Sequence, residues 1–200
     1  AVGNITSIVM GAGPNPSVYG GPLYDYLSFE LHSGFNPTTL ENDVAIITIN
    51  GTFAGQPTVH PIAIATTEIA VSTTNRTRCV VIAWGQTAKG SATSNAAETI
   101  YELMTDQECA AGGANPPSIV CARPTGAGYA CNTDGGAPLV CNGQLYGILT
   151  VQTSCSINAP PVFQKFAKLP AIRIPWNTPT ISTSNATVPI VPRKNYVSCP

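Results

Sequence analysis

The chain has 200 residues, a formal net charge of −1 and only 10% charged residues. This is too little basic charge for a nucleic-acid surface or a polybasic membrane patch, so we expect no nucleic acid as a partner. No apolar run approaches the roughly 18 residues of a spanning helix, so we expect no membrane insertion. The length suits one large or two small domains, and 18 glycines with 18 prolines favour a turn-rich β protein.

Short apolar runs of strand length recur between turn signals along the chain. The second run, V-A-I-I-T-I, has the near-continuous β-branched pattern of a buried strand. Asn142 and Gly143 form a two-residue hairpin signal before the last run. We therefore expect an all-β protein, either a barrel or a sandwich. The runs lie at residues 5–10, 44–49, 79–84 and 145–151.

Three other stretches leave their secondary structure open. Residues 98–104 suit a strand or a short helix, and residues 162–168 suit a strand end or a short helix. Residues 106–111 suit one turn of helix, with Thr105 or Asp106 as its N-cap.

Seven cysteines and four glycosylation sequons indicate a secreted glycoprotein. Cysteines in a chain this poor in charge suggest an oxidising compartment. Their spacings do not fit a zinc site, so we expect no metal and no other cofactor. Each sequon is weak alone, but four of them together with the cysteines predict an extracellular location. The sequon asparagines are Asn4, Asn50, Asn75 and Asn185.

Residues 131–141, C-N-T-D-G-G-A-P-L-V-C, carry the most informative motif. They resemble the active-site segment of the chymotrypsin family of serine proteases, C-x-G-D-S-G-G-P-L-V-C. Gly135 stands where that family has its nucleophilic serine, and Thr133 stands at the position of an oxyanion-hole glycine. A glycine has no side chain to attack a carbonyl, so we expect no enzymatic activity.

Further segments resemble the same family in the same order. Asp43 lies in N-D-V-A-I-I, which resembles N-D-I-A-L-L, where the aspartate orients the catalytic histidine. Residues 79–85, 145–150 and 155–163 resemble C-x-V-x-G-W-G, L-x-G-I-V-S and C-…-G-V-Y. The resemblance implies a chymotrypsin-like double β-barrel.

The N-terminal part departs from the family pattern. His32 and His60 are the two histidines, neither lies in an A-A-H-C segment, and we expect both to be ordinary structural residues. The first strands are also missing, so we expect a shortened or incomplete N-terminal barrel, either reduced or completed by a separate chain. The expected units are a partial N-terminal β-barrel at 1–75, a C-terminal β-barrel at 76–176 and an extended Ser/Thr/Pro-rich tail at 177–200. The tail is either a surface strap or a docking segment for a partner.

The resemblance also locates the substrate pocket. Its base lies six positions before the nucleophile, at Tyr129. Bulky residues at positions where the family has small ones predict a filled core in place of a working pocket. The other pocket-equivalent residues are Thr150, Val151, Gln152 and Pro161.

Two aspartates need partners if the catalytic machinery is absent. In the family, the counterpart of Asp134 pairs with a new N-terminus, but Ala1 lies only 42 residues before Asp43. We expect backbone N–H groups or hydroxyls to satisfy both carboxylates, because a buried unpaired carboxylate is costly.

The resemblance implies three disulfides and leaves one cysteine over. Cys199 is then a free or capped thiol, or it binds a second chain or a second copy. The implied pairs are Cys79–Cys141, Cys109–Cys121 and Cys131–Cys155.

The predicted function is that of a secreted, non-catalytic serine protease homologue that binds a protein partner. Such a protein could act as a cascade cofactor, a decoy, or an effector in immunity, saliva or venom. The alternatives are a structural or storage glycoprotein, or an inhibitor that presents a surface loop.

Overall fold

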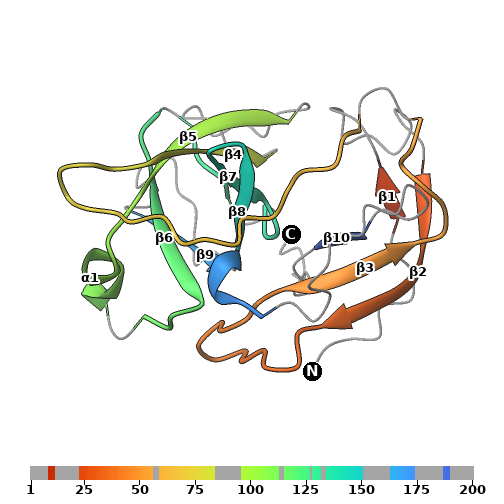
Figure 1. Ribbon diagram of the computed structural model, residues 1–200, viewed down its shortest axis with the longest axis horizontal. Coiled ribbons are helices and arrows are strands. Elements are labelled where there is room, and N and C mark those ends of the chain that lie inside the picture. Colours follow the sequence, from red (N-terminus) through yellow and green to blue (C-terminus); the bar gives the residue numbers. More distant parts are fainter. Residues whose placement is uncertain are drawn as a thin grey trace, which may run out of the picture.

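A computed structural model describes residues 9–11, 23–55, 59–83, 96–112, 115–126, 128–131, 134–150, 163–173 and 187–189. Within these residues the chain forms an open N-terminal sheet and a closed C-terminal barrel, which lie side by side (Figure 1). The fold is therefore all-β with very little helix, as predicted. In the same residues, no helix is long and apolar enough to cross a bilayer.

The N-terminal sheet has the strand order β1-β2-β3-β10 and is antiparallel. Its strands are β1 (Val9–Gly11), β2 (Leu23–Leu31), β3 (Ala45–Ile49) and β10 (Thr187–Pro189). The apolar run at 44–49 supplies β3, most of whose residues are buried, as its sequence predicted. The fourth strand comes from the C-terminal tail, which the sequence pattern did not predict.

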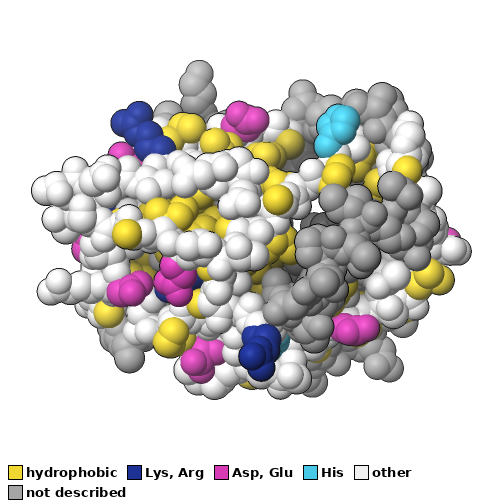
Figure 2. Space-filling model, in the orientation of Figure 1, with side chains coloured by type: hydrophobic (Ala, Val, Ile, Leu, Met, Phe, Trp, Pro, Cys, Tyr) yellow, Lys and Arg dark blue, Asp and Glu magenta, His cyan; other side chains and the backbone are white. Residues whose placement is uncertain are grey.

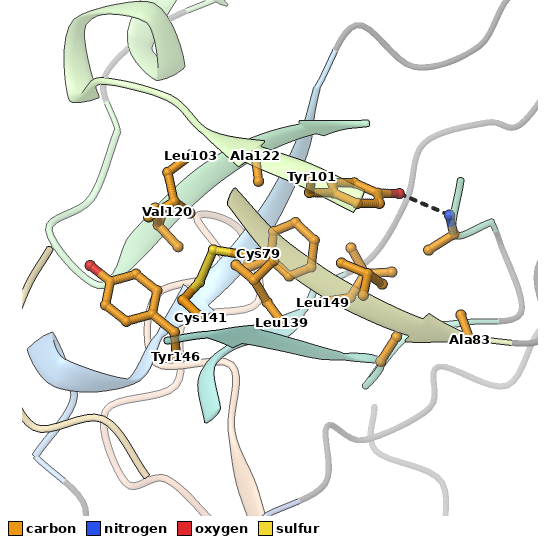
Figure 3. Packing of buried hydrophobic residues seen from close by; sticks show 14 of the residues in the cluster. Cys79, Ala83, Tyr101, Leu103, Val120, Ala122, Leu139, Cys141, Tyr146 and Leu149 are labelled. Atoms are coloured by element: carbon orange, nitrogen blue, oxygen red, sulfur yellow. Dashed lines mark hydrogen bonds between the residues drawn. A yellow bond between two sulfur atoms is a disulfide. The ribbon is translucent and has the colours of Figure 1, made fainter. Parts of the chain in front are cut away.

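The C-terminal barrel closes in the order β4-β5-β6-β9-β8-β7, and every pair is antiparallel. Its inward-facing residues form one apolar core, with Tyr101, Leu139 and Leu149 fully buried in it (Figure 3). The strands are β4 (Arg78–Ala83), β5 (Ala97–Leu103), β6 (Ile119–Pro124), β7 (Pro138–Cys141), β8 (Gln144–Leu149) and β9 (Gln164–Lys168).

Two disulfides between described residues stabilise this barrel. Cys79 and Cys141 lie directly opposite each other on β4 and β7, with their Cα atoms 4.4 Å apart. That spacing suits a pair of residues that do not exchange hydrogen bonds in an antiparallel ladder. The second bond, Cys109–Cys121, joins the helix α1 (Asp106–Cys109) to β6.

The turn between β7 and β8 is the hairpin that the sequence predicted. Asn142 and Gly143 both have positive φ angles, 51° and 75°. A two-residue turn with both φ angles positive matches the right-handed twist of its strands, and Asn-Gly is the sequence that tolerates it best. This turn fixes the register between β7 and β8, and thereby the position of the residues that precede β7.

The three open assignments are now settled. Residues 98–104 lie mainly in strand β5, and residues 164–168 form strand β9. Residues 106–109 form helix α1, and Thr105 is its N-cap. A capping box forms because Thr105 Oγ1 accepts from the N–H of Glu108, while the N–H of Thr105 donates to the Glu108 carboxylate.

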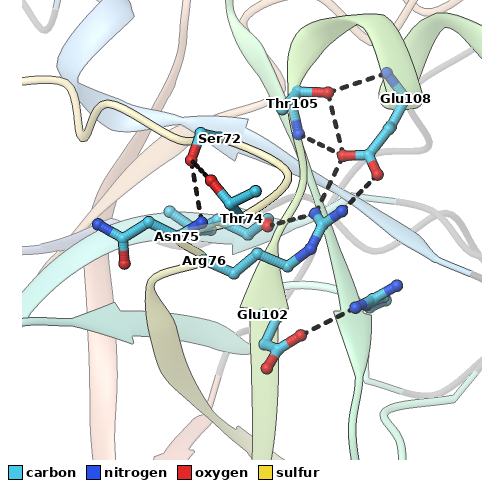
Figure 4. A network of polar contacts seen from close by, with 9 residues as sticks. Ser72, Thr74, Asn75, Arg76, Glu102, Thr105 and Glu108 are labelled. Carbon is cyan, nitrogen blue, oxygen red and sulfur yellow. Dashed lines mark hydrogen bonds and ion pairs between the residues drawn. The ribbon is translucent and has the colours of Figure 1, made fainter.

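An ion pair ties the connecting segment to this helix. Arg76 donates from Nη1 to Glu108 Oε2 at 3.0 Å and to the carbonyl of Leu103 at 3.2 Å (Figure 4). The hydrogen bond from Arg76 lowers the pKa of Glu108 to about 2, with the Thr105 N–H contributing in the same direction. Glu108 therefore satisfies the helix N-terminus and the arginine at once.

The two units share an apolar interface. Val44, next to β3, packs with Leu145, Ile148 and other side chains of the barrel. The connecting segment joins in, because Ile64 and Leu145 form an isolated parallel bridge. This interface fixes the N-terminal sheet against the part of the barrel wall formed by β8 and β9.

Candidate functional site

Gly135 lies on the turn that enters β7. The turn is held by the Ala137 N–H, which donates to the Asp134 carbonyl at 2.8 Å, and by the Gly136 N–H, which donates to the Leu149 carbonyl at 2.8 Å. Gly135 is exposed, and a Cβ atom added to it would meet no atom of the described residues within 4 Å. Its φ angle is not in the left-handed region, whereas that of Gly136 is 93°. A side chain would therefore fit at Gly135, and sterics alone do not require glycine there.

Asp134 is buried behind the same turn, with 6% of its surface exposed. Its Oδ2 accepts the Cys131 N–H at 2.6 Å, and its own N–H donates to the Cys131 carbonyl at 2.8 Å. A backbone N–H thus holds the carboxylate, in line with the expectation from the sequence. These two hydrogen bonds brace the turn.

Asp43 precedes β3 and is also buried, with 3% of its surface exposed. The backbone around it is bent sharply, because Asn42 has a φ of 54° and the Val44 N–H donates to the Asn42 carbonyl at 2.7 Å. The Asn42 N–H donates to Ser118 Oγ at 3.2 Å, which anchors the bend to the barrel. The carboxylate therefore sits on a fixed bend at the boundary between the two units.

Backbone groups hold His32, and His60 lies on the connecting segment. His32 Nδ1 accepts the Gly34 N–H at 3.1 Å, and its Nε2 lies 3.0 Å from the Arg173 carbonyl. Both ring nitrogens are therefore occupied by backbone groups, which fixes the tautomer as Nε2–H. His60 is exposed on the connecting segment.

The described pocket-equivalent residues are buried. Tyr129 has 6% of its surface exposed and Thr150 has none, and Thr150 Oγ1 donates to the Lys165 carbonyl at 2.9 Å. Both side chains lie within the packed interior of the barrel, where a filled pocket would place them. Val151, Gln152 and Pro161 lie outside the described residues.

A polar network that the sequence analysis missed lies beside Tyr129. The Tyr101 hydroxyl donates to Gln164 Oε1 and accepts the Ala130 N–H at 2.9 Å, and Gln164 Nε2 donates to the Ala130 carbonyl at 2.6 Å. Burial is the largest cause of the raised pKa of Tyr101, so the phenol stays neutral. A lone glutamine between aromatic residues was the available sequence signal. Its partners come from distant strands, so the sequence alone could not identify them.

Some of the predicted glycosylation and cysteine positions lie among the described residues, and the others lie outside them. Asn50 and Asn75 are exposed at their sequons, which leaves both accessible to a glycan. Cys131 is disulfide-bonded, while its expected partner Cys155 lies outside the described residues. Across the part of the chain that the structure describes, no group of three His, Cys, Asp or Glu residues could hold a metal ion. Thr133, Asn4, Asn185 and Cys199 also lie outside it.

A family model described as Trypsin matches residues 3–172. The chain belongs to the trypsin family. Trypsin alpha-4 of Lucilia cuprina and trypsin delta of Drosophila melanogaster are each 31% identical to it, over 159 and 158 residues. Each match covers 75% of this chain and 60% of the relative, so the chain spans about three fifths of the length of these trypsins.

A solved structure supports the same fold. It is neuropsin, a serine protease expressed in the limbic system of mouse brain, which superposes with a TM-score of 0.68 at 19% sequence identity. The match covers 82% of this chain and 74% of neuropsin. The C-terminal barrel and the adjoining sheet therefore form a chymotrypsin-like fold, with an N-terminal unit that is an open sheet within the described residues.

Proposed function

We propose that this chain is a secreted, non-catalytic member of the trypsin family that acts by binding a protein partner. The observation that carries the proposal is Gly135, an exposed glycine at the nucleophile position with open space around it. A serine side chain would fit at this position, yet the chain carries a glycine there. Acyl transfer by the family mechanism needs that hydroxyl.

Two further observations support a loss of catalysis. His32 is bonded to backbone groups through both ring nitrogens, which favours a structural role for it. Tyr129 and Ala130 are buried and the Tyr101–Gln164 network clamps Ala130, which favours a packed core over a cavity for a substrate side chain. The glycine at position 135 and the packed surroundings of Tyr129 together favour a scaffold that binds without cleaving.

Secretion and a protein partner complete the proposal. Disulfides persist in oxidising compartments, and this barrel carries two between described residues. On the face in Figure 2, charged side chains of both signs are scattered and form no broad patch. Recognition by shape and backbone contacts therefore suits this chain better than recognition by charge.

A fluorophosphonate probe tests the absence of a nucleophile. The probe labels only an activated serine, so we expect no labelling of the native chain under conditions in which trypsin is fully labelled. The variant G135S restores the hydroxyl, and we expect it to stay unlabelled because, within the described residues, neither histidine forms a hydrogen bond to the turn at position 135. The variant G135A is the matched control for the added Cβ. Labelling of the native chain, or ester hydrolysis that the probe abolishes, would show that the chain is an enzyme.

A further inference from the structure

A small cavity lies at one mouth of the C-terminal barrel, under the connecting segment. β5 and β9 end beside it, and β6 and β8 begin there. Its volume is about 80 Å³, which is room for about five water molecules or one small organic molecule. None of the described residues that line it belongs to the motif of residues 131–141, so the cavity is separate from the site described above.

Two polar contacts hold the connecting segment over this cavity. The Ile69 N–H donates to the Tyr146 hydroxyl at 3.1 Å. Lys168 Nζ donates to Glu68 Oε2 at 2.9 Å. The side chain of Glu68 is 56% exposed, whereas that of Lys168 is 7% exposed. The ammonium group therefore lies inside the mouth of the barrel, and the carboxylate lies at its rim.

Two buried side chains of the lining retain donors that no described residue accepts. The Tyr146 hydroxyl accepts the Ile69 N–H, but its own proton has no acceptor in the described part of the chain. Lys168 Nζ carries three N–H donors, and within the same part Glu68 alone accepts from it. Figure 3 shows the Tyr146 hydroxyl at the margin of the core, pointing away from Tyr101. Because a buried donor is costly when it is unpaired, both groups favour a ligand with an oxygen acceptor.

The charges around the cavity favour a neutral ligand. Lys168 and Glu68 neutralise each other, and Asp106 adds one exposed carboxylate to the lining. Burial is the largest cause of the raised pKa of Tyr146, and both carboxylates raise this pKa further while Lys168 lowers it. All three charges therefore act on the hydroxyl. An anionic ligand would be repelled by the two carboxylates, and a cationic ligand would be repelled by the ammonium group.

We propose that this cavity binds a small neutral compound whose carbonyl or hydroxyl oxygen accepts hydrogen bonds from Tyr146 and Lys168. The apolar part of the ligand would lie against Met104 and Val120, which are buried side chains of the lining. The mouth of a β-barrel is a common position for such a site. The inference does not depend on the protein partner proposed above.

NMR of the methionine methyl groups tests the proposal on the full chain, which has two methionines. Met104 lines the cavity, whereas Met10 lies on β1 and serves as an internal control. The probes are propionamide, propionate and propionamidinium, which share one shape and differ in charge. We expect propionamide to shift the Met104 signal saturably, with a Kd on the order of 1 mM. The two charged probes should bind at least about 10-fold more weakly.

Three variants test the assigned roles. Y146F keeps the ring and removes the donor, so it should weaken the binding of propionamide about 10-fold. Y24F is the matched control, because it removes a buried hydroxyl in the N-terminal sheet, and it should leave this affinity unchanged. D106N removes the exposed carboxylate of the lining, so it should strengthen the binding of propionate about 3-fold.

The absence of a saturable Met104 shift with propionamide would overturn the proposal, because the cavity would then hold water only. Equal affinities for the three probes, or equal shifts of Met104 and Met10, would overturn it as well. If Y146F does not fold, the comparison of the three probes on the native chain decides. No measurement here involves a protein partner or a nucleophile, so a failure is distinguishable from a failure of the function proposed above.

Discussion

Replacement of Tyr101 by phenylalanine isolates the hydrogen bonds that clamp Ala130. Tyr101 is fully buried, and its ring contacts Phe166 edge to face with centroids 6.0 Å apart. Phenylalanine keeps that ring and removes only the hydroxyl. The Ala130 N–H and Gln164 Oε1 then each lose the partner that the hydroxyl supplied.

The expected cost follows from these two bonds. Each is worth about 0.5–1.5 kcal/mol net, and a buried donor that loses its partner moves the sum toward the upper end. We expect Y101F to lower the free energy of unfolding by about 2 kcal/mol. For a chain of this length, that corresponds to a fall in Tm of about 4–8 °C.

Tyr24 offers a matched control in the N-terminal sheet. It is also buried, but its hydroxyl has no hydrogen-bond partner within the structure described. Removing an unpaired buried hydroxyl relieves a desolvation cost, so Y24F should be neutral or slightly stabilising. Urea denaturation with an unchanged m-value measures both variants. The reasoning is refuted if Y101F costs less than about 0.5 kcal/mol or if Y24F costs as much as Y101F.

Three further predictions test the disulfides, the ion pair and the surface chemistry. Loss of the Cys79–Cys141 disulfide, which closes a loop of 62 residues, should lower the free energy of unfolding by about 4 kcal/mol in C79A/C141A. Loss of the Cys109–Cys121 disulfide, which closes a loop of 12 residues, should lower it by about 3 kcal/mol in C109A/C121A. Urea unfolding gives both values, and a reversed order would contradict the loop-entropy reasoning. The Glu108 pKa of about 2 lies below its usual value of 4.5, so its contribution to stability is complete above pH 4.5 and is lost as the pH falls toward 2. E108Q should therefore lose less stability than the native chain between pH 6 and pH 3, and an equal loss would mean that other groups control acid unfolding. Removal of glycans should lower the intact mass of the protein if Asn50 and Asn75 are glycosylated. Reduction should separate the protein into two lighter species if Cys199 is bonded to a second chain.

Local sequence patterns were sufficient for the elements that depend on near neighbours. The β-branched run of β3 and the Asn142–Gly143 turn were predicted from their sequences, because burial on both faces and positive φ angles each favour particular residue types. The single helical turn at residues 106–109 was also predicted, whereas the choice between Thr105 and Asp106 as its N-cap was decided by the structure. The motif of residues 131–141 likewise identified the family.

Local sequence patterns predicted less where the same segment suits a strand and a helix equally well. Residues 98–104 could be a strand or a short helix in isolation, and pairing with both β4 and β6 decided for a strand. β2 was not predicted, since its apolar and polar residues alternate imperfectly around a shift in register between Tyr26 and Ser28. Such choices are made by neighbouring strands and not by the segment itself.

The sequence by itself determined the family and the β architecture of the barrel, and the resemblance alone assigned Gly135 to the position of the family's serine, because these depend on residue identity at fixed spacing. Only the tertiary structure decided that His32 is bound to the backbone at Arg173 and that Tyr101 clamps Ala130 through Gln164. It also decided that β10 covers the edge of β3, about 140 residues away along the chain. Contacts between residues so distant in sequence leave no local periodicity, since they depend on how the closed barrel and the sheet bring separate segments together.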